Sequence, residues 1–254
     1  MILAIIQARF NSSRLPGKIL KEISGKPLLA HVIERVKLSG QVSKVILATT
    51  VHPNDNATCD QAQKCGVDCF RGNEEDVLDR YYSAAKRYNG ESILRVTADC
   101  PLIDPEITDR IIEKYLEGGL DYVSNTIEPT FPDGLDSEVF SFKALEKAWK
   151  EAKKLSEREH VTPYLWNHPQ NFRIKNVAYE KNLSGLRWTV DTKEDLEFVK
   201  EVYKDLYREG QIFYMRDVLH LMERRPELLK INRHPVRNEG YLHSLSKDNV
   251  NRAP

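Results

Sequence analysis

The stretch Ile5-Ile6-Gln7-Ala8-Arg9-Phe10-Asn11-Ser12-Ser13-Arg14-Leu15-Pro16-Gly17-Lys18 decides how this chain is interpreted. An apolar run ends in a loop that carries three cations, two serines and a Pro-Gly pair. Backbone N–H groups in such turns bind phosphate oxygens, and guanidinium groups add charge-assisted hydrogen bonds to the same anion. The glycine lets the main chain approach closely, and the proline fixes its own φ. The stretch therefore predicts a polyphosphate-binding loop built on Arg9, Arg14 and Lys18.

Two common phosphate-binding motifs are excluded. A P-loop reads G-x-x-x-x-G-K-[ST], but Ser12 stands at the first glycine position and Ile19 replaces the Mg²⁺-binding hydroxyl. No G-x-G-x-x-G follows the first apolar run, which argues against a dinucleotide-binding Rossmann enzyme. The alternative is an ordinary basic connection on a solvated surface. We favour the phosphate loop because the cations are clustered and the Pro-Gly-Lys lies among them.

The composition sets the broad class of the protein. The chain has 254 residues, of which 41% are hydrophobic and 30% charged, and these values are typical of a soluble globular protein with a large core. Its 38 basic residues balance 38 acidic ones, which gives no support to a nucleic-acid partner. No apolar stretch approaches the length of a membrane span, and the first residues do not resemble a signal peptide. We therefore expect a cytoplasmic protein without a membrane partner.

Four cysteines stand at positions 59, 65, 69 and 100. They form neither a C-x-x-C pair nor a recognisable zinc spacing, and they are too few to staple a chain of this length. We predict reduced, mostly buried thiols. A metal cluster of Cys59, Cys65 and Cys69 is the alternative, but it has no nearby fourth ligand.

Short apolar runs alternate with amphipathic helical patterns, which is typical of an α/β fold with a mostly parallel sheet flanked by helices. Predicted strands are residues 1–6, 45–48 and 92–96, and predicted helices are residues 28–37, 55–64 and 77–87. Pro105 opens a further helix, as proline does at a first helical position. Residues 187–191 form another apolar run, after which Thr192 caps a helix that reaches about residue 209.

The pattern is less regular from residue 121 to residue 176. Strand-like pieces at residues 121–124, 138–140 and 172–177 surround a helix at residues 142–154, and another helix starts near residue 156. We predict an inserted antiparallel arm here, of a kind that forms an acceptor site or a subunit contact. Residues 232–254 are polar, and we expect either a disordered tail or a segment that lies over its own or a partner's surface.

Two aspartates stand where chemistry is expected. Asp99 follows an apolar run and precedes Cys100-Pro101, and Asp191 has the equivalent place after residues 188–190. Open α/β sheets bind ligands at the carboxyl ends of their strands, and Mg²⁺ is commonly held by one or two carboxylates together with substrate phosphates. The alternative is that Asp99 caps a turn and Asp191 favours the positive end of the following helix. Their occurrence together with the basic loop makes a metal-assisted site the better interpretation.

Four motifs resemble the cytidylyltransferases that activate sugar acids, which include the 3-deoxy-manno-octulosonate and acylneuraminate enzymes. They are the loop from Gln7 to Lys18, Gly25-Lys26-Pro27-Leu28, Ala98-Asp99-Cys100-Pro101-Leu102-Ile103 and Val190-Asp191-Thr192-Lys193-Glu194-Asp195-Leu196. The chain is most similar to the spore-coat polysaccharide biosynthesis protein F family, over about residues 1–210.

The resemblance implies a nucleotide-diphospho-sugar transferase fold and the reaction of CTP with an acceptor to give a CMP-activated product and pyrophosphate. Carried over by position, Asp99 and Asp191 bind Mg²⁺, and the catalytic residues are Arg9, Lys18, Asp99 and Asp191. The implied nucleotide-binding set is Ala8, Arg9, Ser13, Arg14, Lys18, Thr49, Gly72, Asn73, Arg80 and Asp99. Base recognition is expected from Thr49, Gly72, Asn73 or Arg80, although Arg80 is equally interpreted as an exposed helix residue. No dedicated protein base is predicted.

The acceptor region is expected at residues 131–139 together with residues 158–160. Asp133, Asp136 and Glu138 are predicted to bind sugar hydroxyls, and Arg158 to bind a carboxylate or phosphate, with His160 beside it. The alternative is that residues 157–160 form the solvated first turn of a helix. Ala98-Asp99-Cys100-Pro101 replaces the Gly-Asp-Glu-Pro of the octulosonate enzymes, and Lys18-Ile19 replaces the Lys-Asn of the acylneuraminate enzymes. These departures leave the acceptor open.

We therefore expect residues 1–231 to form a nucleotidyltransferase domain that includes the arm at residues 121–176, followed by the polar tail at residues 232–254. The leading hypothesis is a Mg²⁺-dependent enzyme that joins CTP to a sugar acid, working as a homodimer in surface polysaccharide or glycan biosynthesis. A sugar 1-phosphate nucleotidyltransferase with another nucleotide and a non-catalytic sugar-nucleotide-binding relative are the alternatives.

Overall fold

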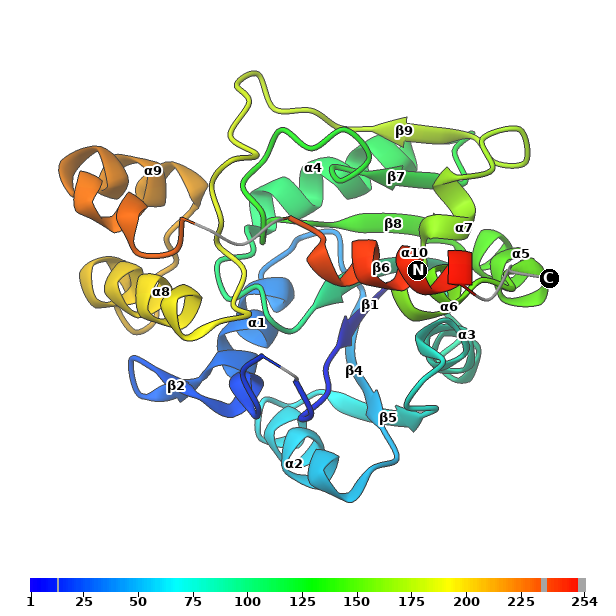
Figure 1. The fold of residues 1–254 in the computed structure, drawn as a ribbon, viewed down its shortest axis with the longest axis horizontal. Helices are drawn as coiled ribbons and strands as arrows, with labels where there is room; N and C mark the ends of the chain where they lie inside the picture. Colours follow the sequence, from blue (N-terminus) through cyan, green and yellow to red (C-terminus); the bar gives the residue numbers. More distant parts are fainter. Residues whose placement is uncertain (13, 234–236, 251–254) are drawn as a thin grey trace.

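A seven-stranded sheet in the order β5-β4-β1-β6-β8-β7-β9 runs through the computed structural model (Figure 1), which describes residues 1–12, 14–233 and 237–250. Strands β1, β4, β5 and β6 are parallel to one another, β8 is antiparallel to both β6 and β7, and β9 pairs parallel with β7. This confirms the predicted α/β fold with a mostly parallel sheet. The strands are β1 (Ile2–Gln7), β4 (Lys44–Thr50), β5 (Asp68–Gly72), β6 (Ser92–Thr97), β7 (Tyr122–Ser124), β8 (Glu138–Ser141) and β9 (Ile174–Asn176).

Helices cover both faces of the sheet (Figure 1). They are α1 (Leu28–Lys37), α2 (Asn56–Lys64), α3 (Val77–Arg87), α4 (Pro105–Leu116), α5 (Phe142–Glu151), α6 (Leu155–His160), α7 (Pro163–Trp166), α8 (Lys193–Leu206), α9 (Met215–Arg224) and α10 (Glu239–Val250). Short 3-10 turns are η1 (Lys18–Leu20), η2 (Pro53–Asp55) and η3 (Pro226–Lys230), and β2 (Glu22–Ile23) pairs with β3 (Lys26–Pro27) in a small antiparallel hairpin. Helices α1 and α3 begin and end at the predicted residues.

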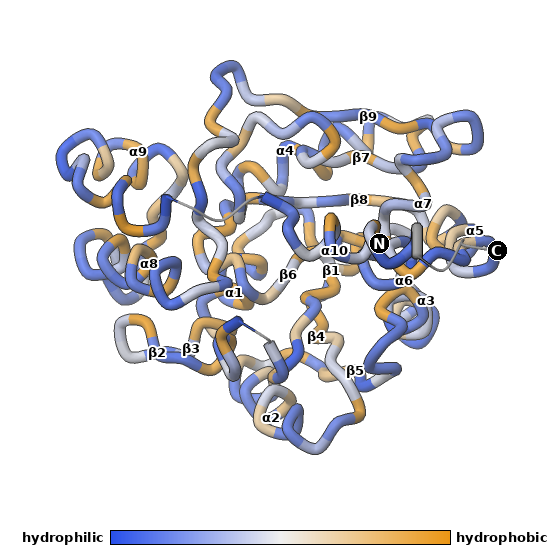
Figure 2. Tube along the Cα trace, viewed as in Figure 1, coloured by the Kyte–Doolittle hydropathy of each residue, from blue (hydrophilic) through white to orange (hydrophobic). Residues whose placement is uncertain are grey.

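The sheet separates two apolar clusters because successive strand side chains point to opposite faces. On β1, Ile2, Ala4 and Ile6 belong to the cluster under α1, α4, α8 and α9. Leu3 and Ile5 belong to the cluster under α3, α5 and α7. Both faces of β1 are therefore buried, which explains its continuous apolar sequence. Figure 2 shows hydrophilic segments along much of the outer surface of the molecule.

Strand register brings three chain segments together at one edge of the sheet. Gln7, the last residue of β1, pairs with Ala48 of β4 and with Thr97 of β6. Because these strands are parallel, the loop after β1 and the residues after β6 leave the sheet side by side. This edge is where ligands bind in open α/β sheets.

Two expectations about strands change in the structure. Residues 121–176 contain antiparallel pairing, as predicted, but their three strands extend the central sheet. Residues 187–191 do not form a strand, since Arg187 makes only an isolated bridge to Asp133. The segment is instead held by single backbone hydrogen bonds, from Trp188 N to Asp133 O at 2.6 Å and from Val190 N to Asp99 O at 2.8 Å.

The prediction that the cysteines are reduced thiols is wrong for two of them. Cys59 on α2 and Cys69 on β5 form a disulfide, with their Cα atoms 5.5 Å apart. Helix α2 runs back along the sheet edge and brings the two residues together, although their spacing of ten matches no disulfide or metal motif. Cys65 and Cys100 are free, and Cys100 is buried.

The polar C-terminal region contains a helix. Of the two alternatives for residues 232–254, α10 shows the second, since it lies on the surface of its own chain against α6 (Figure 1). Asp248 accepts hydrogen bonds from Ser156 N at 3.2 Å and Ser156 Oγ at 2.5 Å, which fastens the end of α10 to α6. Within the described ranges, none of the helices is long and apolar enough to cross a membrane.

Candidate active site

The loop after β1 is shaped around Phe10 and Gly17. Phe10 N donates to Asp55 Oδ1 at 2.7 Å, and Gly17 N donates to Phe10 O at 3.0 Å. Gly17 has φ of 66°, and a Cβ at this position would lie 3.2 Å from the Phe10 ring. Left-handed backbone and close ring contact both favour glycine here. This turn delivers Lys18 to the interior, as the first residue of η1.

Lys18 joins the two predicted metal-binding aspartates. Its Nζ lies 2.8 Å from Asp99 Oδ2, 2.8 Å from Asp191 Oδ1 and 2.8 Å from Val190 O. The Lys18 side chain is only 9% exposed, so these oxygens replace its water shell. The structure thus brings Lys18, Asp99 and Asp191 together in one cluster.

The charges of this cluster stabilise one another. Burial alone would lower the pKa of Lys18, but Asp99 and Asp191 raise it above its ordinary value. Burial would raise the pKa of Asp99, whereas the Lys18 ammonium lowers it to about 2. Lys18 and Asp99 are therefore both ionised at neutral pH. The side chains of Asp99 and Asp191 converge on the Lys18 ammonium.

Asp191 reaches this position from an irregular segment, which corrects the expectation that it follows a strand. Arg187 holds it in place, with Nη2 2.6 Å from Asp191 Oδ2, while other Arg187 nitrogens contact Asp133 at 2.8 Å and Asp195 at 3.0 Å. Thr192 caps α8 by accepting from Asp195 N, as predicted. Arg187 gave no signal in the sequence, although it stands only four residues before Asp191.

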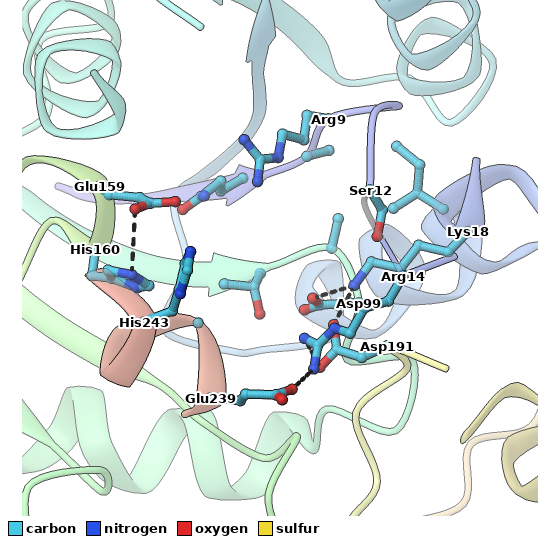
Figure 3. Close-up of a pocket in the computed structure, with 16 residues that line it drawn as sticks. Arg9, Ser12, Arg14, Lys18, Asp99, Glu159, His160, Asp191, Glu239 and His243 are labelled. Carbon is cyan, nitrogen blue, oxygen red and sulfur yellow. Dashed lines mark hydrogen bonds and ion pairs between the residues drawn. The ribbon is translucent and has the colours of Figure 1, made fainter. Parts of the chain in front are cut away.

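A cavity of about 500 Å³ opens beside this cluster (Figure 3). The predicted loop residues Ala8, Arg9, Arg14 and Lys18 line it, together with Gln7 and Ser12. Arg14 Nη2 lies 3.1 Å from Asp191 Oδ2, and Arg14 also pairs with Glu239 of α10. Ser13, which was predicted to contact the nucleotide, lies outside the described residues.

The residues predicted to recognise the base are not in the lining of this cavity. Arg80 is fully buried and donates from Nη1 to Asn73 O at 2.5 Å, whereas its Nε and Nη2 have no partner in the described part of the chain. Asn73 Oδ1 accepts from the backbone N–H groups of Glu75 and Asp76 just before α3. A Cβ on Gly72 would lie 2.9 Å from the Phe70 ring and 3.1 Å from Arg80 Cγ, so glycine makes room for both side chains.

Thr49, the remaining predicted base-binding residue, is buried at the end of β4. Its Oγ1 has no hydrogen-bond partner among the described residues, and neither does Gln7 Oε1 at the end of β1. Unsatisfied buried polar atoms are uncommon, and they often mark a position that a ligand or water completes. The alternative interpretation of Arg80, as an exposed helix residue, is wrong because its side chain is fully buried.

A second cavity, of about 450 Å³, adjoins the first at Asp99 and Asp191. Four predicted acceptor residues line it: Asp133, Asp136, Glu138 and His160. The fifth, Arg158, lines neither cavity. Arg158 instead contacts Asp76 at 3.0 Å and donates to Trp149 O at 2.7 Å, and so connects α6 to α3 and α5.

The floor of the second cavity contains ion pairs. Glu138 pairs with Arg95 of β6 and accepts from Tyr122 Oη at 2.5 Å. Asp136 Oδ1 lies 2.6 Å from Arg237 Nη2. Burial, with Asp133 and Glu138 nearby, outweighs Arg237 and raises the pKa of Asp136 to about 7.

The two cavities adjoin along a set of residues that line both, and we call this shared lining the seam. Arg14, Thr97, Asp99, His160 and Asp191 line both, and so does the first turn of α10 through Glu239 and Gly240. In Figure 3, Lys18, Asp99 and Asp191 lie on one side, Glu159 and His160 lie on the other, and Glu239 reaches towards Arg14. Two ligands that fill the two cavities would thus meet beside Asp99 and Asp191.

Several lining residues were missed because their signals are weak in the sequence. Arg95 is a single charge within an apolar strand, and it shares the face of Thr97 by the two-residue period of β6. Glu239 and Tyr241 belong to a segment that reads only as a polar tail. Trp166 is one aromatic residue in a short helix, and nothing in the sequence around it indicates a binding role.

The family model described as cytidylyltransferase matches residues 3–219 of the chain. An uncharacterized protein of Methanocaldococcus jannaschii, MJ1063, is 39% identical over 94% of this chain and 97% of its own length. The spore coat polysaccharide biosynthesis protein SpsF of Bacillus subtilis is 33% identical over 89% of this chain and 95% of its own length. A solved cytidylyltransferase structure from Leptospira borgpetersenii has a TM-score of 0.87 and 33% identity, and the alignment covers 92% of this chain and 98% of that chain. These matches confirm the resemblance found in the four sequence motifs.

Proposed function

The chain belongs to the cytidylyltransferase family, and we propose on that premise that it transfers CMP from CTP to a sugar acid of the ulosonic or nonulosonic type, with Mg²⁺ as cofactor. An acceptor hydroxyl oxygen forms a bond to the α-phosphorus, and the bond from that phosphorus to the oxygen bridging to the β-phosphate breaks. The hydroxyl proton passes to solvent, and pyrophosphate leaves. The observation that carries this proposal is that Asp99 and Asp191, which Lys18 joins, line both cavities.

The first cavity suits the triphosphate. Arg9 forms no ion pair with any residue that the structure describes, and Arg14 is bound only through partly exposed contacts. Guanidinium groups in such positions are available to phosphate oxygens. We assign Ala8, Arg9, Arg14 and Lys18 to the triphosphate, with Ser13 as a remaining prediction. Their role is to orient the α-phosphate and to stabilise charge that develops on the departing pyrophosphate.

Asp99 and Asp191 fit a bound Mg²⁺. Their carboxylates converge closely enough for a single ammonium to contact both at 2.8 Å, and Mg²⁺ accepts this kind of oxygen donor set. When bound, Mg²⁺ would neutralise phosphate charge and orient the two reactants. Mg²⁺ commonly completes its shell with water and substrate phosphates, so two carboxylates are enough protein ligands.

Base recognition remains a prediction for Thr49, Gly72, Asn73 and Arg80. Cytosine offers one amino donor and two acceptors, and Gln7 Oε1 and Thr49 Oγ1 are buried oxygens without partners among the described residues. Gln7 lines the first cavity, so it adds a candidate for the amino group. Arg80 would need a local opening before a base reached it, because its side chain is fully buried.

The second cavity suits the acceptor. Asp133, Asp136 and Glu138 supply oxygen acceptors for sugar hydroxyls, and His160 contributes a neutral ring, because burial lowers its pKa to about 4. Arg95 and Arg14 are the cations in this lining that are placed to meet an acid group of the acceptor. Arg158, in contrast, is proposed to position α6 through Asp76.

The relative SpsF is named for spore coat polysaccharide biosynthesis, and we propose that the product here also feeds the synthesis of a surface polysaccharide or glycan. The homodimer, with residues 121–176 at the contact, and the cytoplasmic location remain predictions. The same is true of the division into a domain at residues 1–231 and a tail at residues 232–254.

Pyrophosphate release tests the proposed function. The purified chain is incubated with each of the four ribonucleoside triphosphates, with and without Mg²⁺, and with a panel of ulosonic acids, sugar 1-phosphates and small hydroxy acids. We expect release with CTP, Mg²⁺ and a sugar acid, and its loss in Asp99→Asn. Release with UTP and a sugar 1-phosphate alone would replace the proposal by the second hypothesis. CTP binding without turnover of any acceptor would support the non-catalytic alternative.

A further inference from the structure

The guanidinium group of Arg187 contacts three carboxylates in the wall of the second cavity. Its Nη1 lies 2.8 Å from Asp133 Oδ2, its Nη2 lies 2.6 Å from Asp191 Oδ2, and its Nε lies 3.0 Å from Asp195 Oδ1. The Arg187 side chain is only 8% exposed, so these oxygens take the place of water around it. Because the group is planar and its donors have fixed directions, it holds the three carboxylates in fixed relative positions.

Asp195 is the base of this arrangement. It is fully buried on the first turn of α8, and its Oδ2 accepts from the backbone N–H groups of Asp191 and Thr192, each at 3.0 Å. Asn232 Nδ2 donates to Asp195 Oδ1 at 3.1 Å and to Arg187 O at 2.9 Å. The position of the guanidinium group is therefore set by contacts within the chain.

The two carboxylate oxygens of Asp191 have different partners. Oδ2 lies 2.6 Å from Arg187 Nη2 and 3.1 Å from Arg14 Nη2, whereas Oδ1 lies 2.8 Å from Lys18 Nζ. In Figure 3, Arg14 and Lys18 both reach Asp191 from the segment after β1. Arg187 thus keeps Asp191 Oδ1 directed to the place that Asp99 also faces, where the proposed Mg²⁺ would be held.

The two carboxylate oxygens of Asp133 are divided in the same way. Oδ2 is bound to Arg187, whereas Oδ1 accepts no hydrogen bond from the residues that the structure describes. Asp133 lines the second cavity and not the first. Its Oδ1 is therefore the atom that is placed to accept from a hydroxyl group of the acceptor.

The chain segments that carry these acids are held together by their backbones. Asp133 N donates to Leu186 O at 2.9 Å, and Trp188 N donates to Asp133 O at 2.6 Å. The segments approach so closely that a Cβ on Gly134, which has φ of 110°, would lie 2.6 Å from Thr189 N. Since these contacts need no side chain, the guanidinium group is left to orient the carboxylates.

We propose that Arg187 is a positioning residue for both reactants. It directs Asp191 Oδ1 towards the metal and Asp133 Oδ1 towards the acceptor, so that the metal-bound nucleotide and the acceptor hydroxyl are held in the relative positions that transfer needs. Because one rigid group holds both acids, a change at Asp133 alters metal binding, although Asp133 is not a metal ligand. This inference rests on the proposed function.

The first variant is Arg187→Lys, which keeps the positive charge but has one nitrogen in place of three. Its matched control is Arg225→Lys, because Arg225 also contacts three carboxylates, Glu201, Asp205 and Glu227, and lines neither cavity. Binding of Mn²⁺ in the presence of CTP is measured by electron paramagnetic resonance, with Mn²⁺ as the probe for Mg²⁺. Pyrophosphate release and melting temperature are measured on the same proteins.

We expect Arg187→Lys to bind Mn²⁺ about tenfold more weakly and to lower kcat by about 10²-fold, the range for loss of a group that orients a metal ligand. The KM for the acceptor should rise, while binding of CTP without metal stays within about twofold. Arg225→Lys should keep the Mn²⁺ affinity of the wild type, even if its melting temperature falls.

The second variant tests the link between the two acids and does not depend on the folding of Arg187→Lys. Asp133→Asn should weaken Mn²⁺ binding by about fivefold in the wild type and have no further effect in Arg187→Lys. Asp136→Asn is the matched control, because it removes an acid from the same cavity that pairs with Arg237 and not with Arg187. It should leave Mn²⁺ binding within about twofold.

Three outcomes overturn the inference. The first is unchanged Mn²⁺ binding in Arg187→Lys, and the second is an equal effect of Asp133→Asn and Asp136→Asn on Mn²⁺ binding. The third is an effect of Asp133→Asn that is the same with Arg187 and with lysine at that position. The proposed function fails separately, if the wild type binds Mn²⁺ and CTP but releases no pyrophosphate with any acceptor, because the pattern of Mn²⁺ binding would still decide the role of Arg187.

Discussion

The two halves of the proposed site, a nucleotide half at the first cavity and an acceptor half at the second, are built in different ways. The first cavity takes much of its lining from one continuous stretch, Gln7 to Lys18, which follows the end of β1. The second takes its lining from β6, the loop before β8, helices α6 and α7, the segment before α8 and the first turn of α10. Anion binding by backbone and guanidinium groups needs only a local turn, whereas a shaped acceptor cavity needs distant segments. Under the proposed function, the residues that bind the nucleotide are therefore close together in the sequence, whereas those that select the acceptor come from distant segments.

The largest expected effect comes from the seam where both halves meet. Asp99→Asn and Asp191→Asn should each lower kcat for CTP-dependent pyrophosphate release by about 10³-fold, since each removes a charge that the proposed Mg²⁺ site needs. Steady-state kinetics over a range of Mg²⁺ concentrations measures this. Circular dichroism and the melting temperature serve as controls for folding. Either variant with full Mg²⁺-dependent turnover would contradict the assignment of the seam.

The second expected effect is on the free energy of unfolding and comes from a disulfide in the nucleotide half. The Cys59–Cys69 disulfide closes a short loop between α2 and β5, in the nucleotide half. The Cys59→Ser, Cys69→Ser double variant should be less stable to unfolding by about 2–3 kcal/mol, because the open chain regains loop entropy in the unfolded state. Urea denaturation gives the value, and Cys65→Ser is the matched control. An unchanged midpoint in the double variant, or no effect of reductant on the wild type, would show that this link does not stabilise the protein.

The third effect concerns the acceptor half and pH. The pKa of Asp136 is raised to about 7, so between about pH 4 and pH 7 the folded state binds more protons at this group than the unfolded state does. This contribution therefore makes the free energy of unfolding fall as pH rises through that window. Asp136→Asn should remove this pH-dependent contribution. The free energy of unfolding of the variant minus that of the wild type should therefore increase with pH. The difference is measured by urea titration at several pH values. Asp121→Asn is the control, because the pKa of Asp121 is lowered and not raised. A difference that is constant with pH would refute the assignment.

The smallest effect tests the contact between the two halves. Glu239 pairs with Arg14, which we assign to the triphosphate, so bound CTP competes with this carboxylate. Glu239→Gln should lower the KM for CTP by up to about fivefold, the range expected for a partly exposed ion pair. Glu223→Gln, on α9, is a control for a change of net charge. A raised KM for CTP in Glu239→Gln would instead show that Glu239 supports nucleotide binding.

The sequence was informative about the nucleotide half because its signals are local. The loop cations, the apolar run of β1 and the acid after β6 are each visible within about ten residues. Asp99, Asp191 and Lys18 could therefore be assigned to one site, and α1 and α3 to their observed bounds. Asp191 was nevertheless placed after a strand, because an apolar run of five residues does not reveal that its backbone lacks a partner strand.

The acceptor half was predicted less completely for a physical reason. Asp133, Asp136 and Glu138, which were predicted to bind sugar hydroxyls, all line the second cavity. Arg158 was expected in the acceptor site, but Asp76, 82 residues away in the chain, draws it to α3. Tyr241 was missed because the segment before it is polar and α10 has little apolar patterning of its own. Only long-range contacts decide these positions, and a single sequence does not show them.

The proposed metal-assisted site is tested most directly by calorimetric binding of CTP, with and without Mg²⁺, to the wild type, Asp99→Asn and Asp191→Asn. The proposed function requires that CTP enters the first cavity and meets a metal held by the carboxylates of Asp99 and Asp191. It predicts Mg²⁺-dependent binding of CTP that is stronger than that of the other three nucleoside triphosphates and is lost or strongly weakened in both variants. Equal CTP binding by all three proteins, with no dependence on Mg²⁺, would contradict it.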